Sequence, residues 1–544
     1  MLRICLVGTI KPERSIVVKS IHTVLLLVIW SSASTLSAQE AWPQAAGPNG
    51  SWRTVTERRA PTHWSGSTGR NIRWAATLEE GGQSGIAVAG DRLFLTINRP
   101  LPAGTTAADA VGTDIIGLCI DANTGETRWQ IELPGSKPMP HSGLFSDNTS
   151  PTPVTDGRRV WFVNAGGLIT CCTVDGKRVW LREFEARTRH NAKNCEPMLY
   201  GEWVMYVAMR DEDDSARRPM LAQKGKRESD SSDWPWTYIR AWDKSTGQPK
   251  WVAEDGTSIH NTPTCGMAGG RPVMFHGRGG GHRPPEEPYG FSLTSLDPLS
   301  PGKTLWRRDI TSGMAFFVTN FDDRHAYCFD TGALVLLDIE SGEIQKTISL
   351  FQDVDVRTWD AASGKYTLQS NTNFSPQGKR PRSYPTNQTN IVVGDHCLFM
   401  SHEGHMIGRA NVNTGKVEYL QVPIQAVRSR DAGEQLLWDR HIPADTKNSR
   451  GIDTAADRRA KGDGWGHVTA ASPIAVNHLV YLSTMLGTVY VIDATADRLD
   501  ADSLIAVNDL GPAGQSWSLS SLSYADGRLY HRGLKRLVCI EDSP

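Results

Sequence analysis

Short apolar runs alternate with turn residues along most of the chain. Runs such as RLFLT (92–96), RVWFV (159–163) and HCLFM (396–400) each follow a Gly-Asp, Asp-Gly or similar pair. Runs of four to eight residues bounded by turn signals are typical of β-strands, and no long stretch repeats its apolar residues at helical spacing. With 51 glycines in 544 residues, this pattern predicts an all-β chain built from many short strands.

One unit recurs between these strands. AWDKSTGQPKW (241–251) places an acid, a Thr-Gly turn and a Trp at fixed offsets, and CIDANTGETRW (119–129) has the same spacing. Looser copies are LDIESGEIQK (337–346), ANVNTGKVEY (410–419) and the shortened TVDGKRVW (173–180). The Asp accepts backbone N–H groups and the Gly takes a positive φ. The Trp is predicted to pack between sheets, where burying its area contributes a gross ~4–6 kcal/mol.

The repeats predict a ring of eight sheets. Each repeat has four strands, and they start near residues 83, 148, 194, 261, 313, 387, 469 and 518. The last has only three strands, and NIRWAATL (71–78) is a Trp-bearing strand with no partner before it. Pairing that strand with the final sheet closes the ring and removes exposed edges. We therefore expect an eight-bladed β-propeller of four-stranded antiparallel blades over residues 39–544, closed by its N-terminal strand.

The repeat unit resembles a known family. The pattern A-x-D-x-x-T-G-x-x-x-W, complete at 241–251, is similar to the tryptophan-docking motif of PQQ-type propellers, and WPQAAGPNG (42–50) is similar to the opening of secreted bacterial PQQ-binding-like repeat proteins. Relatives of this kind include quinoprotein dehydrogenases, which bind PQQ and Ca²⁺, and non-catalytic BamB-like envelope lipoproteins. The chain departs from both: it has no lipid-anchor Cys after its apolar run, and calcium ligands and a catalytic acid cannot be assigned from the motif.

The first 38 residues predict a secretory signal peptide. Four basic residues precede the apolar run 24–30, and small residues then lead to a cleavage position near Ala38. The run is shorter than the roughly 20 residues that span a bilayer, although a membrane-anchored form is the alternative. After cleavage, 54 basic and 58 acidic residues give a net charge of −4. We therefore expect a secreted or periplasmic protein with no transmembrane span and no nucleic-acid partner.

The eight cysteines beyond residue 38 are predicted to be apolar core residues. Cys119 and Cys539 occupy the same position in their repeats, and Cys328 and Cys397 share another. Adjacent residues in a strand point to opposite faces, which favours two separately packed thiols at Cys171–Cys172 over a vicinal disulfide.

Polar residues gather where each repeat begins. In a propeller these opening segments lie around one mouth of the central channel, where a pocket or cofactor would bind. The alternative is that they satisfy strand-end backbone groups. If a quinone binds, the resemblance makes Asp147 and Glu196 the calcium-directed carboxylates. The candidate binding residues are Asp147, Asn148, Asn194, Glu196, His260, Asn261, Asn387, Gln388, His402, Glu403 and His467, with His190 and His405 nearby.

Three insertions interrupt the rhythm, at 210–233, 352–385 and 428–464. They are interpreted as solvated surface loops in preference to a binding lid. Three classes of function follow. The first is a scaffold that binds an envelope protein or a small-molecule or sugar ligand, without catalysis. The second, implied by the resemblance, is a PQQ- and calcium-dependent oxidoreductase of alcohols or sugars, and a hydrolase or lyase on the same face is a third.

Overall fold

The computed structural model describes residues 40–141, 146–186, 195–209, 237–257, 261–278, 290–309, 319–330, 332–373, 390–400, 405–454 and 471–542. The compact unit runs from Gln39 to Pro544. Within the described ranges it is built from β-strands, with one short 3-10 helix, η1 (Ala107–Asp109). None of the helices in these ranges is long and apolar enough to cross a membrane.

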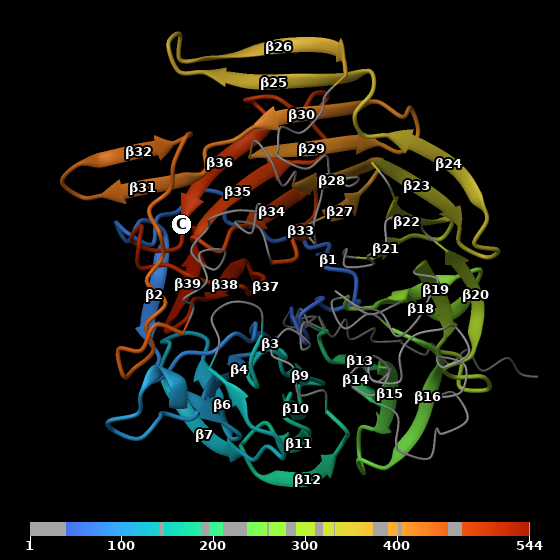
Figure 1. Ribbon diagram of the computed structural model, residues 1–544, viewed down its shortest axis with the longest axis vertical. Coiled ribbons are helices and arrows are strands. Elements are labelled where there is room, and N and C mark those ends of the chain that lie inside the picture. The colour runs from blue at the N-terminus through green and yellow to red at the C-terminus, as the bar shows by residue number, and fades with distance from the viewer. Residues whose placement is uncertain are drawn as a thin grey trace, which may run out of the picture. The chain divides into compact units, whose positions relative to one another are not determined.

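The strands form eight antiparallel blades arranged in a ring (Figure 1). In the first four blades each sheet follows chain order. Blade 1 contains β3 (Ala87–Ala89), β4 (Arg92–Asn98), β6 (Ile115–Asp121) and β7 (Thr127–Leu133); blade 2, β9 (Val154–Thr155), β10 (Arg159–Asn164), β11 (Leu168–Thr173) and β12 (Arg178–Glu183); blade 3, β13 (Met198–Tyr200), β14 (Trp203–Met209), β15 (Thr237–Asp243) and β16 (Pro249–Gly256); and blade 4, β17 (Thr264–Ala268), β18 (Arg271–Arg278), β19 (Gly290–Ser295) and β20 (Thr304–Asp309).

The remaining blades keep the same four strands, and two of them carry additions. Blade 5 contains β21 (Asn320–Phe321), β22 (His325–Asp330), β23 (Ala333–Asp338) and β24 (Ile344–Ser349); blade 6, β27 (Asn390–Val393), β28 (His396–Met400), β29 (Met406–Asn411) and β30 (Val417–Gln421); blade 7, β33 (Ile474–Val476), β34 (Leu479–Ser483), β35 (Thr488–Asp493) and β36 (Leu504–Asp509); and blade 8, β37 (Ser523–Ala525), β38 (Arg528–Arg532), β39 (Arg536–Glu541) and β2 (Ile72–Thr77).

The ring closes as the sequence predicts. Strand β2 is the fourth strand of blade 8 and pairs antiparallel with β39, with Trp74 opposite Cys539 and Ala75 opposite Val538. A second N-terminal strand, β1 (Arg53–Thr54), pairs in parallel with β33 of blade 7. Both ends of the sequence therefore contribute to the same two neighbouring blades, and the prediction of an eight-bladed, N-terminally closed propeller is confirmed.

Tryptophans from the repeat unit lie between neighbouring blades. At five seams the Trp of one outer strand covers the turn glycine of the next blade: Trp74 on Gly125, Trp129 on Gly176, Trp180 on Gly247, Trp251 on Gly302 and Trp306 on Gly342. At blades 5 and 6 the Trp is replaced by Lys346, whose Nζ donates to the Val412 carbonyl at 3.0 Å. Packing of a Trp ring over a turn glycine therefore occurs at the seams where the blades keep the motif.

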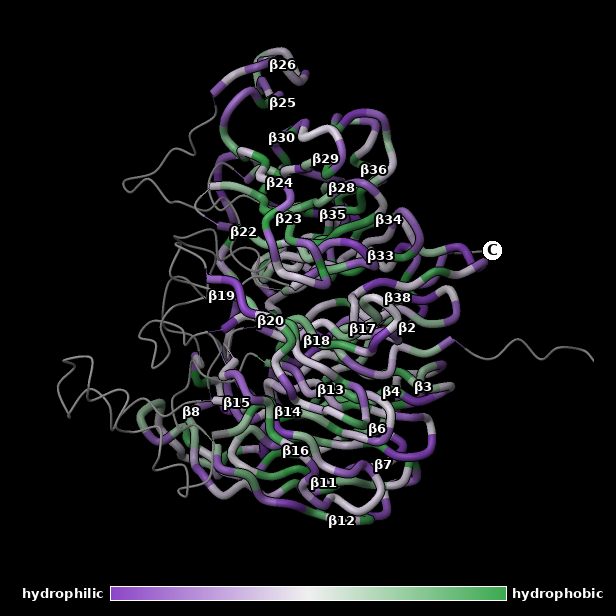
Figure 2. Tube along the Cα trace, turned by 90° about the vertical axis from the view of Figure 1, so that its right-hand side faces the viewer, coloured by the Kyte–Doolittle hydropathy of each residue, from purple (hydrophilic) through white to green (hydrophobic). Residues whose placement is uncertain are grey.

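The core consists of apolar layers between blades. In Figure 2 the apolar residues follow the strands, and polar residues dominate the turns. Cys171 and Cys172 are free and fully buried. They pack into different clusters, Cys171 with the blade 3 residue Val204 and Cys172 with the blade 1 residue Phe94. The two thiols thus point to opposite faces of β11, and the structure has no vicinal disulfide between them.

Two of the insertions differ from the loops that the sequence suggests. Residues 352–385 include the hairpin β25 (Val354–Asp360) and β26 (Lys365–Thr372), and β25 extends blade 6 by parallel pairing with β30. The stretch near 428–464 begins in the hairpin β31 (Gln425–Ser429) and β32 (Gly433–Leu437). A further short pair joins β5 (Val111–Gly112) to β8 (Met139–Pro140). Insertion 210–233 lies outside the described residues. The charge and polarity of these insertions suggested loops, whereas the alternation of apolar and polar residues within them forms the hairpins.

Candidate functional site

The site predicted from sequence is the face made by the segments that lead into each blade, here named the connection face. The second-to-third-strand turns lie on the same face, since Asn98 at the end of β4 donates to Asp147 and the Ala165 N–H donates to the Asn148 carbonyl. Of the predicted residues, the structure describes Asp147, Asn148, Glu196 and Asn261, together with His405 of the two nearby histidines. The others lie outside the described residues: His190, Asn194, His260, Asn387, Gln388, His402, Glu403 and His467.

Asp147 holds the segment leading into blade 2. Its Oδ1 accepts the Thr149 N–H at 2.8 Å and the Thr149 hydroxyl at 2.5 Å, while Oδ2 accepts the Asn98 amide at 3.1 Å. The side chain is only 2% exposed. Both carboxylate oxygens therefore have protein donors, which is the arrangement expected of a buried structural acid.

Asn148 and Asn261 act in the same way. The Asn148 amide donates to the carbonyls of Gly112 and Thr113, each at 3.1 Å, and so ties blade 2 to the turn region of blade 1. Asn261 Oδ1 accepts the Gly277 N–H at 2.9 Å inside blade 4. Both amides are buried, at 2% and 1% exposure. The alternative that polar residues here satisfy strand-end backbone groups applies to both.

Glu196 joins three blades. Its carboxylate accepts the Thr152 N–H at 2.6 Å and the Thr152 hydroxyl at 3.1 Å from blade 2, and its own N–H donates to the Thr262 hydroxyl of blade 4 at 3.0 Å. Burial raises the pKa of Glu196 to about 7, although the Thr152 hydrogen bonds act in the opposite direction. The carboxyl therefore changes charge close to neutral pH.

These bonds belong to a series that crosses six seams. Around the inner ends of the blades, each opening segment bonds to the next. The pairs are Ser520 to the Ser84 carbonyl, the Gly85 N–H to Thr152, Thr152 to Glu196, Glu196 to Thr262, Thr319 to the Thr262 carbonyl, and Asn320 to Asn390. We call this series the seam bonds. It joins blade 8 through blades 1 to 5 to blade 6, so the described connection face is tied together tangentially.

A buried ionic group beside Asp147 was not predicted. Arg532, at 1% exposure, donates from Nη1 to the Ser84 carbonyl at 3.2 Å, and its Nη2 has no hydrogen-bond partner within the described ranges. Burial lowers the pKa of Arg532 to about 9, and Asp147 opposes that change. Burial also lowers the pKa of His141, opposed by Asp147 and Glu80. No motif marks these residues because they meet only when blades 8, 1 and 2 come together.

The described acids do not form a calcium site. Asp147 and Glu196 direct their oxygens at donors in their own seams, and nowhere in the described ranges do three His, Cys, Asp or Glu side chains gather as metal ligands would. Ca²⁺ takes six to eight oxygen ligands at about 2.3–2.6 Å, which these seam acids do not offer. Within those ranges, the set implied by the resemblance does not fit a resident calcium ion.

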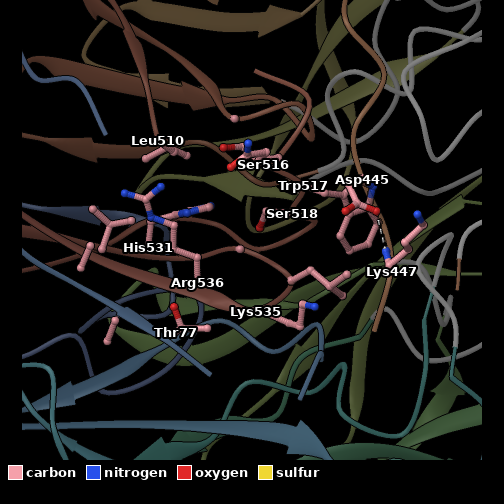
Figure 3. Close-up of a pocket in the computed structure, with 17 residues that line it drawn as sticks. Thr77, Asp445, Lys447, Leu510, Ser516, Trp517, Ser518, His531, Lys535 and Arg536 are labelled. Atoms are coloured by element: carbon pink, nitrogen blue, oxygen red, sulfur yellow. Dashed lines mark hydrogen bonds between the residues drawn. The ribbon is translucent and has the colours of Figure 1, made fainter. Parts of the chain in front are cut away.

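The connection face also contains a cavity that the sequence did not indicate. It has a volume of about 560 Å³ and lies where blades 7 and 8 meet, lined by Thr77, Lys447, Ser516, His531, Lys535 and Arg536 among others (Figure 3). Its residues come from five separate segments of the chain, so their convergence depends on ring closure by β2. The candidates predicted from the sequence lie at the opening segments and at the turn 402–405, and none of them lines this cavity.

Comparison with known proteins places part of the chain in a repeat family. Residues 112–281, which are 170 of 544, match the family described as outer membrane protein assembly factor BamB. No curated protein sequence matches the chain. The matched segment spans most of blades 1 to 4 and contains three of the five Trp-covered glycines, Gly125, Gly176 and Gly247.

Similar solved structures include proteins of both expected classes. BamB from Moraxella catarrhalis is 11% identical, with 86% of this chain and 99% of that chain covered and a TM-score of 0.43. Quinohemoprotein alcohol dehydrogenase from Comamonas testosteroni is 11% identical, at 93% and 81% coverage and 0.47. A europium-containing methanol dehydrogenase is 10% identical, at 92% and 89% coverage and 0.49. Similarity this low does not choose between their functions. The chain is an eight-bladed β-propeller, and its residues 112–281 match the family described as outer membrane protein assembly factor BamB.

Proposed function

We propose that this protein is a non-catalytic binding propeller that presents its connection face to a protein of the cell envelope, after export directed by residues 1–38. The observation that supports it best is that the two carboxylates predicted to bind calcium form hydrogen bonds between blades. Asp147 and Glu196 bond across seams and thereby stiffen the face. A rigid surface lowers the ordering cost of association, which suits a scaffold.

The family match supports the same reading. Residues 112–281 match a family described as an outer membrane assembly factor, and this segment includes the seam residues Asn148, Thr152 and Glu196. The motif's Trp and Gly residues lie at the seams and serve the architecture, as the Trp180 ring over Gly247 illustrates. The partner would therefore be recognised by the connection face and its loops.

The test combines cross-linking with an activity assay. Full-length protein expressed in its native host should cross-link to an envelope protein through lysines of the connection face, such as Lys137, and much less through Lys177 on the opposite face. Purified protein with PQQ and Ca²⁺ should reduce no dye with alcohols or sugars. Dye reduction that needs both additives would overturn the proposal in favour of the quinoprotein oxidoreductase. Cross-links spread evenly over both faces would remove the connection face as the binding surface.

A further inference from the structure

The cavity between blades 7 and 8 has the size of a small-molecule site. Its volume of about 560 Å³ lies within the roughly 300–1,000 Å³ typical of ligand pockets. One wall is β2 and β39, a second is the segment 510–518 that leads into blade 8, and Asp445 and Lys447 also line the cavity. Figure 3 shows Lys447 and Asp445 at one end, with the Lys447 N–H bonded to the Asp445 carboxylate at 3.1 Å, and His531 and Arg536 at the other.

The charge of the lining is positive. Three cationic side chains, Lys447, Lys535 and Arg536, face one carboxylate, Asp445, which leaves a surplus of two positive charges. The chain as a whole carries −1, so this concentration of cations is local. A concave, positively charged surface attracts anions more strongly than scattered surface lysines do.

The cations have donors to spare. Lys535 Nζ donates to the Asn448 carbonyl at 3.2 Å, and Arg536 Nη2 donates to the Gly66 carbonyl at 3.0 Å. A lysine carries three N–H donors and an arginine five. These two bonds hold the side chains at the cavity wall and leave further donors for an anionic group, so the lining is positioned before a ligand arrives.

His531 is the second, independent sign of a ligand. It lies on β38, lines the cavity and is 3% exposed, and its Nε2 has no hydrogen-bond partner in the described part of the chain. A buried polar atom without a partner costs about 1–3 kcal/mol. Burial lowers the pKa of His531 to about 3, with Arg532 acting in the same direction. The ring is therefore neutral at pH 7, and its Nε2 can donate or accept according to tautomer.

Part of the remaining lining is apolar. Leu510, Trp517, Leu534 and Val538 contribute to the wall, together with the small residues Ala75 and Ala76. An inorganic ion would leave this surface without contacts, whereas a compact organic body would cover it. The lining thus combines a cationic end, an apolar wall and one polar atom in need of a partner.

We propose that this cavity binds a small organic anion, whose carboxylate or phosphate lies at the end formed by Lys447 and Lys535 and whose apolar body and one polar group extend past Trp517 toward His531 and Arg536. The cavity lies on the connection face, but the proposal rests on the lining of the cavity and not on partner binding there.

Two pairs of probes test the proposal on the full chain. Benzoate and phenyl phosphate carry the anionic group, and benzamide and phenol are their uncharged counterparts; binding is measured by saturation-transfer NMR and calorimetry. We expect at least one anion to bind at least about tenfold more tightly than its uncharged counterpart, since hydrogen bonds to charged groups are the stronger ones. The preferred anion distinguishes a carboxylate site from a phosphate site.

Matched variants locate the binding. The double variant Lys447→Gln/Lys535→Gln should weaken the anion by about tenfold or more, while Lys177→Gln/Lys365→Gln, at two exposed lysines outside the cavity, should leave it unchanged. Equal binding of charged and uncharged probes overturns the proposal. So does unchanged affinity in Lys447→Gln/Lys535→Gln, or the absence of binding by both anions at 10 mM, about the weakest affinity expected of such probes.

Discussion

At the scale of single residues, the polar groups of the connection face serve structure before chemistry. Asp147 and Glu196 were predicted to be cation ligands because acids at the inner ends of blades can hold a cation. In the structure their oxygens accept hydrogen bonds from Thr149, Asn98 and Thr152. The same residue types suit both roles, so the sequence alone could not separate them. The separation comes from where the neighbouring blade places its donors.

Glu196 should make stability depend on pH between about 4.5 and 7. Its pKa is raised from 4.5 to about 7 in the folded protein, so the favourable, protonated state is fully present below pH 4.5. That contribution is lost as pH rises through 7. Glu196→Gln should therefore raise the Tm at pH 8 relative to wild type and flatten its change between pH 5 and 7, as measured by calorimetry. Glu126→Gln, at an exposed turn, is the control, and an equal effect there would contradict the assignment.

Gly247 is a residue where the docking motif leaves no room for a side chain. Its φ is +70°, and a Cβ there would lie 2.7 Å from the Trp180 ring. Gly247→Ala should therefore lower the free energy of unfolding by about 1–3 kcal/mol, combining left-handed strain with the clash. Gly157→Ala, which has φ +81° and nothing within 4 Å of the added Cβ, isolates the strain. Equal losses in denaturant titrations of the two variants would show that the Trp180 contact is unimportant.

At the scale of elements, the added hairpins are tied to the ring by charge. Glu418 of β30 is 4% exposed and pairs with Arg409 at 2.6 Å and with Arg357 of β25 at 3.5 Å. The Arg357 guanidinium also donates to the Leu499 carbonyl of blade 7 at 3.1 Å. One buried carboxylate therefore joins the β25–β26 hairpin, blade 6 and blade 7.

Removing that charge should loosen the hairpin. Glu418→Gln leaves two buried guanidinium groups without their counter-ion, which typically costs about 3–5 kcal/mol. Hydrogen exchange should accelerate first in residues 354–372 and in β30. Glu343→Gln, at an exposed position in blade 5, serves as the control. If exchange in 354–372 were unchanged in Glu418→Gln, the hairpin would be held by its backbone pairing with β30 alone.

The sequence predicts features that depend on residues close together in the chain, and it does not predict contacts between distant segments. The turn at Asp243 and Gly247 is local, so its spacing revealed the blades and their number. The addition of β25 to blade 6 could not be predicted, because its partner β30 is far away in the sequence: Asp355 pairs with Glu418. The Arg532–Asp147 group and the cavity at His531 join segments hundreds of residues apart, and no local pattern records such contacts.

At the scale of the whole molecule, closure by β2 positions every proposed surface. Trp74 lies at the seam between the last blade and the first, where its Nε1 donates to the Ala122 carbonyl at 3.0 Å and its ring covers Gly125. The cavity also depends on this strand, because Ala75, Ala76 and Thr77 form part of its wall.

Trp74→Ala should weaken the closure as a unit. Loss of the ring and its hydrogen bond is expected to cost about 2–4 kcal/mol and to speed hydrogen exchange together in β2, β39 and the 121–127 turn. Trp438→Ala removes a ring stacked on Trp359 at 4.6 Å beside the outer hairpins, so its effect should stay there. Exchange that rises only within β2 would mean that the seam does not depend on this ring.

The central claim, that the connection-face acids hold blades together and do not hold a cofactor, is tested most directly by unfolding Asp147→Asn with and without Ca²⁺ and PQQ. The account predicts that the variant loses about 2–4 kcal/mol in the absence of both, because Asn98 and Thr149 lose a charged acceptor and the buried Arg532 loses the negative charge that favours its charged form, and that neither additive changes the Tm of wild type. A wild-type Tm that rises with Ca²⁺ and PQQ, together with an Asp147→Asn variant that is fully stable without them, would contradict it.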